Sequence, residues 1–214
     1  MSKIELLSVY GSDTMVVDVA RVSFDKKADN YTSEQNNRLL SYLAKHNHVS
    51  PFFHPKLNFR LHIPIYCERQ LIKTQIGVEY NSISGRYCDF SDTYTLINEW
   101  RTQSKDSKQG SAEPLDYEGQ EACNIIEHNV VEACKKAYKD LIKLGVSKEQ
   151  ARTILPLNLN TNMIYTCSLY AFIRLCKQRL KSDAQTETRE IVAEMLRQLK
   201  ENGNFAESLK VFDL

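Results

Sequence analysis

The sequence predicts a mixed α/β (α+β) fold in which a small mixed or antiparallel sheet packs with helices and the C-terminal half is helical. Three observations predict it. Residues 57–63 alternate apolar and polar side chains, which is the period of a half-buried strand. Residues 120–144 place apolar side chains at near-helical spacing. The 214 residues, 42% of them hydrophobic, suit a globular core, so we expect a single domain over 1–214.

The first half is expected to mix short strands and helices. Ser33 is a candidate N-cap, because its hydroxyl can accept from a free amide at a helix start. Pro51 and Pro55 resist helix and central-strand positions. The expected elements are a strand at 4–9, helices at 13–22 and 34–45, a loop at 50–55, the strand at 57–63, a helix carrying 68–75 and then a polar loop.

The second half is expected to be helical after a long surface segment. Residues 93–119 show no clear period and are rich in polar side chains, so we expect a surface excursion of the kind that often serves as a lid or an insertion. Two tetrapeptides, 147–150 and 182–185, have the pattern of capping boxes. The expected helices cover 120–144 with Gly145 as its end, 147–154 before Pro156, 162–180, and 182–201 before Gly203.

Composition excludes several classes of protein. A net charge of +1 gives no electrostatic case for nucleic-acid binding, and no apolar run approaches membrane-spanning length. The N-terminus lacks the apolar core of a signal peptide, and none of the six cysteines forms a Cys-x-x-Cys pair. We therefore expect buried thiols in a reducing cytoplasm. His46 and His48 lack a third ligand at sensible spacing, so no metal is expected.

Three arginines are candidates for binding an anion. Ser84, Gly85 and Arg86 combine a hydroxyl, a permissive backbone and a guanidinium fork, which together suit a phosphate; the alternative is a solvated turn. Arg152 precedes an apolar run, and an arginine beside a core needs an anionic partner or several acceptors. Arg179 lies near the end of a predicted helix among other cations, where compensation of the helix dipole is the alternative.

No conventional catalytic motif is present. The sequence contains neither a Gly-x-Ser-x-Gly elbow nor a P-loop, and it lacks the Gly-x-Gly-x-x-Gly dinucleotide fingerprint. None of the cysteines has the setting of a nucleophile. A bound cofactor is therefore expected to supply the difficult chemistry, with the protein positioning charges around it.

Several segments in register resemble the flavin-dependent thymidylate synthases over nearly the whole chain. The early Ala-Arg-Val-Ser-aromatic segment, the His-x-Ser-Pro-Phe segment, the Ser-Gly-Arg-Tyr segment and the Ala-Arg-x-x-Leu-Pro segment all follow in the family's order. Their positions here are 20–24, 48–54, 84–87, 151–159, and Arg179 with 183–187.

The resemblance implies an α/β fold assembled as a homotetramer with active sites shared between subunits. It implies transfer of a methylene from 5,10-methylenetetrahydrofolate to carbon 5 of deoxyuridylate (dUMP), forming thymidylate (dTMP). FAD, reduced by NADPH, would deliver the hydride, and no enzyme cysteine would attack the base. The partners would be these small molecules, with neither nucleic acid nor membrane.

The same resemblance assigns residues. Arg179 would lie against the pyrimidine and stabilise the charge developing there. His48 and Ser50 would face the flavin. The nucleotide would be held by Gln70, Ser82, Ser84, Gly85, Arg86 and Arg152.

The chain departs from the family mainly on the flavin side. Lys73, Thr74 and Gln75 stand where the family has Arg-His-Arg, and a lysine neutralises phosphate without the bidentate fork. Ser82 replaces a glutamate beside the nucleotide loop. The later Asn-x-Arg flavin contact falls on Ser168 and Tyr170, which with Arg174 complete the candidate cofactor residues. Tyr170 could stack on a cofactor ring, or it could belong to the core.

Two other functions stay open. Loss of flavin contacts would let water quench the methylene adduct, which makes the chain a pyrimidine deoxynucleotide C5-hydroxymethylase of the same fold. A non-catalytic nucleotide-binding relative would retain Ser84, Arg86 and Arg152 without redox chemistry.

Overall fold

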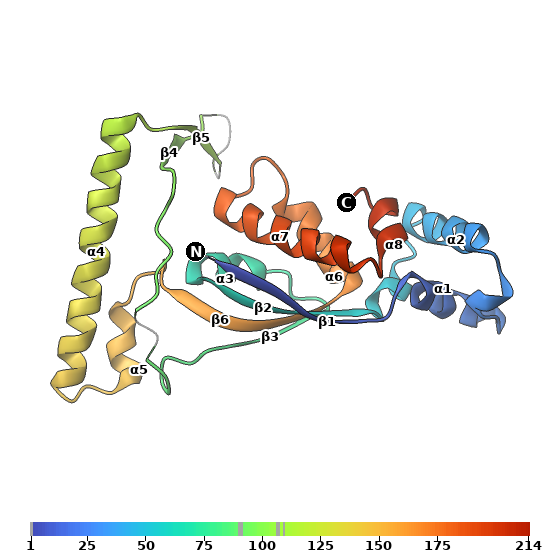
Figure 1. The fold of residues 1–214 in the computed structure, drawn as a ribbon, viewed down its shortest axis with the longest axis horizontal. Helices are drawn as coiled ribbons and strands as arrows, with labels where there is room; N and C mark the ends of the chain where they lie inside the picture. Colours follow the sequence, from blue (N-terminus) through green and yellow to red (C-terminus); the bar gives the residue numbers. More distant parts are fainter. Residues whose placement is uncertain (1, 90–91, 106–107, 109) are drawn as a thin grey trace.

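A four-stranded antiparallel sheet forms the centre of the protein (Figure 1). The computed structural model describes residues 2–89, 92–105, 108 and 110–214. The strand order is β1-β2-β6-β3, and each neighbouring pair is antiparallel. The strands are β1 (Lys3–Tyr10), β2 (Lys56–Pro64), β3 (Val78–Ser82) and β6 (Asn160–Ser168). The predicted mixed α/β fold with a small sheet is confirmed. Of the two kinds of sheet that were predicted, mixed or antiparallel, the four-stranded sheet is antiparallel.

Strand β2 confirms the prediction made from its alternating sequence. Leu57, Phe59, Leu61 and Ile63 are all 0% exposed, while the residues between them are partly or fully exposed. Because every second side chain faces the core, a shift of register by one residue would expose the whole apolar set. The first predicted strand, at 4–9, lies within β1 and pairs with β2.

Strand β6 corrects the prediction of a single helix over 162–180. Residues Asn160–Ser168 form a strand, and helix α6 covers Leu169–Arg179. The strand pairs with β2 on one side and β3 on the other, and buried residues alternate with partly or fully exposed ones from Thr161 to Cys167. The sequence does not show this alternation, because the buried face includes the polar Thr161 and the other face includes the apolar Ile164. The change of structure occurs at Ser168, whose hydroxyl accepts from the Ala171 amide at 3.2 Å and caps α6.

Strand β3 forms one edge of the sheet, within the segment predicted as a polar loop. Its residues are largely exposed, so the sequence there is polar in spite of its strand conformation. The strand follows Gly77, which adopts a φ of +78°. That conformation favours glycine and turns the chain from α3 into the sheet.

Helices α6 and α7 cover one face of the sheet, together with α3 (Figure 1). The core lies at this junction, where the rings of Phe59 and Phe172 stack with centroids 5.7 Å apart. Helices α1, α2 and α8 pack together at the other end. The bounds are α1 (Asp13–Arg21), α2 (Ser33–Lys45), α3 (Ile65–Leu71), α7 (Thr186–Asn202) and α8 (Ala206–Val211).

Several predicted helix boundaries are wrong. Thr32, not Ser33, caps α2, because its hydroxyl accepts from the Gln35 amide. Helix α3 ends at Leu71 rather than reaching residue 75. The tetrapeptide 182–185 forms a turn and not a capping box, so α7 begins at Thr186. The short predicted helix at 147–154 is α5 (Lys148–Ala151) followed by a 3-10 turn, η4 (Arg152–Ile154).

The excursion at 93–119 and helix α4 (Tyr117–Lys143) form an arm that stands apart from the helices on the sheet (Figure 1). The excursion is not structureless, since β4 (Arg101–Gln103) and β5 (Ser111–Pro114) pair as a hairpin. Its start joins the sheet through amide hydrogen bonds from Thr95 to Asn158 and from Asn160 to Thr93. Its middle joins α4, because the Trp100 ring nitrogen donates to Asn124 at 3.0 Å.

Three of the six cysteines, Cys67, Cys167 and Cys176, are buried as expected, while Cys88 is exposed. Burial raises the pKa of the Cys67 thiol to about 12, so it stays protonated. Within the described part of the chain, no helix has the length and apolar character needed to cross a membrane.

We predict that Gly77→Ala destabilises the fold by about 2–4 kcal/mol. A Cβ at this position would strain the backbone and would lie 2.6 Å from the Ser168 hydroxyl oxygen. Gly145→Ala is the matched control, since its φ is +86° but a Cβ would meet nothing within 4 Å. Urea unfolding should show a clearly smaller loss for the control; equal losses would contradict the close approach to Ser168.

Candidate functional site

The structure brings Arg179 and Gln70 together, as expected. Arg179 ends α6, and its Nη2 donates to the Gln70 carbonyl oxygen at 2.9 Å. The Nε atom of Arg179 is buried and has no hydrogen-bond partner among the described residues. A buried, charged donor without an acceptor is costly, so this guanidinium is suited to meet an electron-rich atom of a ligand.

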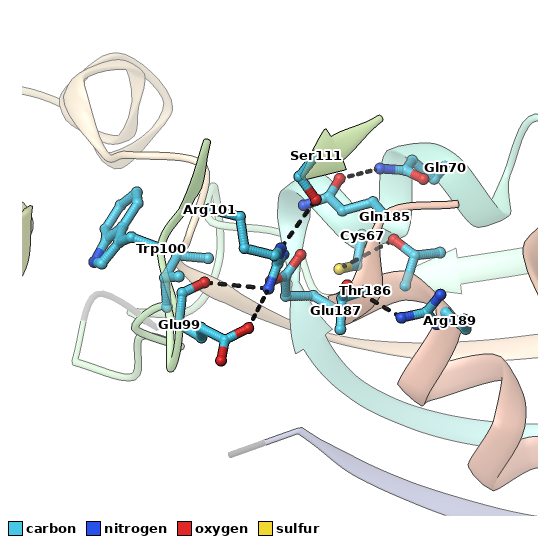
Figure 2. A network of polar contacts seen from close by, with 12 residues as sticks. Cys67, Gln70, Glu99, Trp100, Arg101, Ser111, Gln185, Thr186, Glu187 and Arg189 are labelled. Atoms are coloured by element: carbon cyan, nitrogen blue, oxygen red, sulfur yellow. Dashed lines mark hydrogen bonds and ion pairs between the residues drawn. The ribbon is translucent and has the colours of Figure 1, made fainter. Parts of the chain in front are cut away.

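The side chain of Gln70 connects this centre to the start of α7. Its Nε2 donates to Gln185 Oε1 at 2.5 Å, and Gln185 is the N-cap residue of α7 (Figure 2). The Thr188 hydroxyl also contacts the Cys67 sulfur at 3.5 Å, which joins α7 to α3 a second time. Three helices, α3, α6 and α7, therefore meet around Arg179.

Arg101 from the excursion reaches the same helix terminus. Its Nη2 lies 2.7 Å from Glu187 Oε1, and both side chains are about one-sixth exposed, at 16% and 17% (Figure 2). Burial raises the pKa of the Glu187 carboxyl, but the hydrogen bond from Arg101, with further ones from its own backbone and from Gln185, outweighs burial and lowers it below the ordinary value. The carboxylate is thus held ionised in a largely buried position.

Ser82 meets an acidic side chain that sequence reasoning did not identify. Its hydroxyl donates to Glu68 Oε1 from α3. Ser82 stands where the related family has a glutamate, so a carboxylate lies beside this position in spite of the replacement. Glu68 had a weak signal in the sequence: it falls within the helix that also carries Gln70.

The expected phosphate-binding residues lie beyond the end of β3. The Ser84 hydroxyl accepts from the amide and Nε of Arg86, both at 3.4 Å. Gly85 is buried, whereas Arg86 is exposed, with its guanidinium 5.2 Å from the Tyr87 ring centre. The loop is therefore a turn whose arginine is free to swing toward an anion.

Arg152 lies in the segment that contacts this loop, but its surroundings differ from the expectation. It starts η4, directly after α5, and the α5 residue Lys148 donates from Nζ to the Tyr87 carbonyl at 3.4 Å. Arg152 is exposed, and its Nε donates to the Glu149 carbonyl at 3.4 Å. The prediction that the neighbouring apolar run would bury it is wrong, because Ile154 and Leu157 are themselves exposed.

Of the residues expected to face the flavin, Ser168 and Gln75 lie at the start of β3, where the Ser168 amide donates to Gly77 and the Val78 amide donates to Gln75. Ser168 is buried and caps α6, while Thr74 is 2% exposed with a hydroxyl that has no partner among the described residues. Lys73 and Gln75 on either side of Thr74 are exposed. His48 is also exposed and forms a ring cluster with Tyr42 and His46. Ser50 begins the 3-10 turn η3 (Ser50–Phe53).

Tyr170 and Arg174 share a cavity of about 570 Å³ with three lysines, Lys45, Lys177 and Lys210. The Tyr170 ring also packs on Phe53, at a centroid distance of 5.2 Å. Aromatic faces beside several cations fit a flat ring system that carries phosphates. The residues present therefore fit a flavin nucleotide.

The sheet separates Ser82, of the expected nucleotide group, from Ser168, of the expected flavin group, whereas Gln70 and Thr74 of the same two groups lie close together in the chain. In the sheet, Ser82 lies opposite Met163, whereas Val78 lies opposite Cys167, one residue before Ser168. Five residues of strand β6 therefore separate the nucleotide end from the flavin end, which is roughly 17 Å at about 3.3 Å per residue.

Comparisons with known proteins identify the family of the chain. The model of the family described as "Thymidylate synthase complementing protein" matches residues 5–202. The flavin-dependent thymidylate synthase of Kosmotoga olearia is 36% identical over 185 residues, covering 86% of this chain and 79% of that protein. The enzyme of the same name from Thermosipho melanesiensis is 29% identical over 198 residues, covering 92% and 85%.

A solved structure shares the fold. The crystal structure of the UMP/dUMP methylase PolB from Streptomyces cacaoi, bound with 5-Br UMP, superposes with a TM-score of 0.86. The similarity covers 99% of this chain and 93% of that one at 21% sequence identity. At this identity the likeness establishes the fold alone.

Proposed function

The chain belongs to the family of flavin-dependent thymidylate synthases, and on that premise we propose that it converts deoxyuridylate to thymidylate. The carbon donor in this proposal is 5,10-methylenetetrahydrofolate, and the hydride comes from FAD reduced by NADPH. Chemistry on the base, and not binding alone, is favoured by one observation: Arg179 presents a buried Nε without an acceptor.

The proposed role of Arg179 is electrostatic. The hydrogen bond from Nη2 to the Gln70 carbonyl holds the guanidinium plane in one orientation. The remaining donors can then point at a pyrimidine oxygen where negative charge develops during attack at carbon 5. A donor fixed in advance stabilises such charge without reorganisation during the reaction.

The proposed phosphate site combines the loop after β3 with the segment around α5. Ser84, the Gly85 amide, Arg86 and Arg152 supply donors, and Lys148 adds a third cation nearby. Gln70 and the Ser82–Glu68 pair lie closer to Arg179 and would contact the sugar or base. The exposed arginines have room to close on an anion when it binds.

The flavin is proposed to bind near Thr74, Tyr170 and Arg174, with His48, Ser50, Lys73, Gln75 and Ser168 around it. Bound flavin, once reduced, supplies the hydride. The chain's own residues orient it: Arg174, Lys45 and Lys177 offset the phosphate charge, and Tyr170 offers a ring face. These cations support binding although the family's Arg-His-Arg is absent.

We propose that the chain assembles as a homotetramer in which the nucleotide end of one subunit meets the flavin end of another. The separation of the two ends along β6 supports shared sites. Helix α4 supports assembly, because it buries only Val131 and Tyr138 against the described part of its own chain. Apolar side chains at Tyr117, Ile125, Ile126 and Val130 remain exposed on it.

The proposed reaction is tested by product analysis. We expect the purified protein with FAD, NADPH and methylenetetrahydrofolate to convert dUMP to a product in which a methyl group replaces the hydrogen at carbon 5, a net mass gain of CH2 measured by mass spectrometry. UMP is assayed in parallel, since the PolB neighbour is titled a UMP/dUMP methylase. A hydroxymethyl product would support the hydroxymethylase instead. Calorimetric binding of dUMP without any product would indicate the non-catalytic relative.

The proposed role of Arg179 predicts the kinetics of Arg179→Ala. The turnover number should fall by on the order of 10²-fold, because a preorganised donor to the developing charge is lost. Arg38→Ala is the control, since Arg38 is an exposed arginine of α2 paired with Glu34. Unchanged turnover in a folded Arg179→Ala protein would disprove the assigned role.

The proposed assembly predicts that Ile126→Glu shifts the protein from tetramer to smaller species, measured by sedimentation. A charge placed on a 63% exposed isoleucine would cost little in an isolated chain but would disrupt an apolar interface. His128→Glu adds a charge elsewhere around the exposed surface of the same helix and serves as the control. Equal effects of the two substitutions would exclude this face as the contact.

A further inference from the structure

Arg101, in strand β4 of the excursion hairpin, contacts the first turn of α7. All three kinds of nitrogen in the Arg101 guanidinium are engaged. Nε donates to the Ser111 hydroxyl at 3.0 Å and Nη1 to the Glu99 carbonyl at 3.1 Å, both within the excursion. Nη2 leaves the excursion and meets Glu187 at 2.7 Å. Two hydrogen bonds within the excursion hold the Arg101 guanidinium in one orientation, and its third nitrogen, Nη2, faces α7.

The contacted end of α7 is the part that holds the candidate catalytic centre. Glu187 lies in the first turn of α7, two residues after Gln185. Gln185 accepts from the Gln70 side chain, and the Gln70 carbonyl accepts from Arg179. Figure 2 shows the succession from Ser111 and Arg101 through Glu187 and Gln185 to Gln70. Each step is a hydrogen bond or covers two residues of one helix turn.

The turn that precedes α7 is held from its own helix by Arg189, whose Nη1 donates to the Ser182 carbonyl at 3.2 Å and whose Nη2 donates to the Thr186 hydroxyl at 3.3 Å. A cavity of about 420 Å³ separates the hairpin from residues 182–186, and it is lined by both. The hairpin therefore does not pack tightly on this turn, and the Arg101–Glu187 pair bridges the space. The second Glu187 oxygen, Oε2, is buried without a partner among the described residues. Arg101 is the positively charged partner of this largely buried carboxylate, so its loss would leave the Glu187 charge without a counter-ion.

We propose that the β4–β5 hairpin is a strap that positions Arg179, and that Arg101 and Glu187 are positioning residues for methyl transfer. The inference rests on the proposed function for its kinetic consequence. Arg101 holds Glu187 and the start of α7, Gln185 then holds Gln70, and the Gln70 carbonyl sets the orientation of Arg179. Neither Arg101 nor Glu187 needs to contact the nucleotide.

Hydrogen exchange tests the strap without requiring turnover. We expect Arg101→Leu to speed exchange by about tenfold or more in amides of 182–189 and 65–71. Arg101→Lys keeps the charge but loses the fork, and should lie between wild type and Arg101→Leu. Ser111→Ala removes one bond to Nε and serves as a mild variant that should fold normally. Unchanged exchange in both segments in all three variants would overturn the proposal, whatever the enzyme's activity.

Kinetics test the consequence for catalysis. Arg101→Leu should lower the turnover number by about tenfold or more, because a small misplacement of a catalytic group is enough for such a loss. The KM for dUMP should stay within about twofold, since nucleotide contacts are retained. Arg101→Lys should recover part of the turnover. A folded Arg101→Leu enzyme with wild-type turnover would overturn the proposal.

A double-mutant cycle and a matched arginine complete the test. If Arg101 acts through Glu187, the losses of Arg101→Leu and Glu187→Gln should be clearly less than additive in the double variant. Arg197→Leu removes an exposed arginine of the same helix that pairs with Glu194 and Glu201, and should leave turnover unchanged. Additive losses would contradict the pathway. Absence of wild-type product would refute the proposed function but leave the exchange result decisive for the strap.

Discussion

The pairing of β6 with strands on both sides is the constraint on which the rest of the structure depends. Its start receives the excursion, since the Asn160 amide donates to Thr93 at 2.8 Å. Its end caps α6 through Ser168, and α6 in turn carries Arg179 to Gln70. Because the strand is hydrogen-bonded along both edges, these attachments are held at a constant separation. The positions of both ends of the candidate site therefore depend on strand β6.

The predictability of the fold followed the clarity of each local pattern. Strand β2 has one buried face, so apolar and polar residues alternate along its sequence. Helix α4 is 27 residues long, so its apolar residues recur at helical spacing over several turns. Strand β6 has one buried face, but polar Thr161 lies on that face and apolar Ile164 on the other, and the chain continues directly into α6, so periodicity could not separate strand from helix. Strand β3 is an exposed edge with a polar sequence. Its pairing to β6 comes from distant residues that no local pattern contains.

Site residues that belong to short sequence motifs could be predicted, whereas pairs of residues that meet only in the folded chain could not. The short segments around Arg86, Arg152 and Arg179 identified a family, whereas the hydrogen bond from Arg179 to the Gln70 carbonyl is known only from the structure. The Arg101–Glu187 pair joins residues 86 positions apart, within a segment that had no recognisable pattern. Glu68 likewise meets Ser82 only because α3 folds back beside β3. Such pairs depend on tertiary structure, so the sequence carries no signal for the Arg101–Glu187 pair and only a weak one for Glu68, from its place in the helix that carries Gln70.

The sparse packing of α4 on its own chain couples the arm's stability to protein concentration. Whatever covers the helix binds the folded arm and not the unfolded one, so by mass action the covering stabilises the arm more as subunits become more concentrated. The arm includes the attachment of the excursion to α4 through Trp100. In the proposed tetramer, dilution would therefore loosen the excursion before it unfolds the sheet, and the proposed activity would be lost at concentrations where the core remains intact.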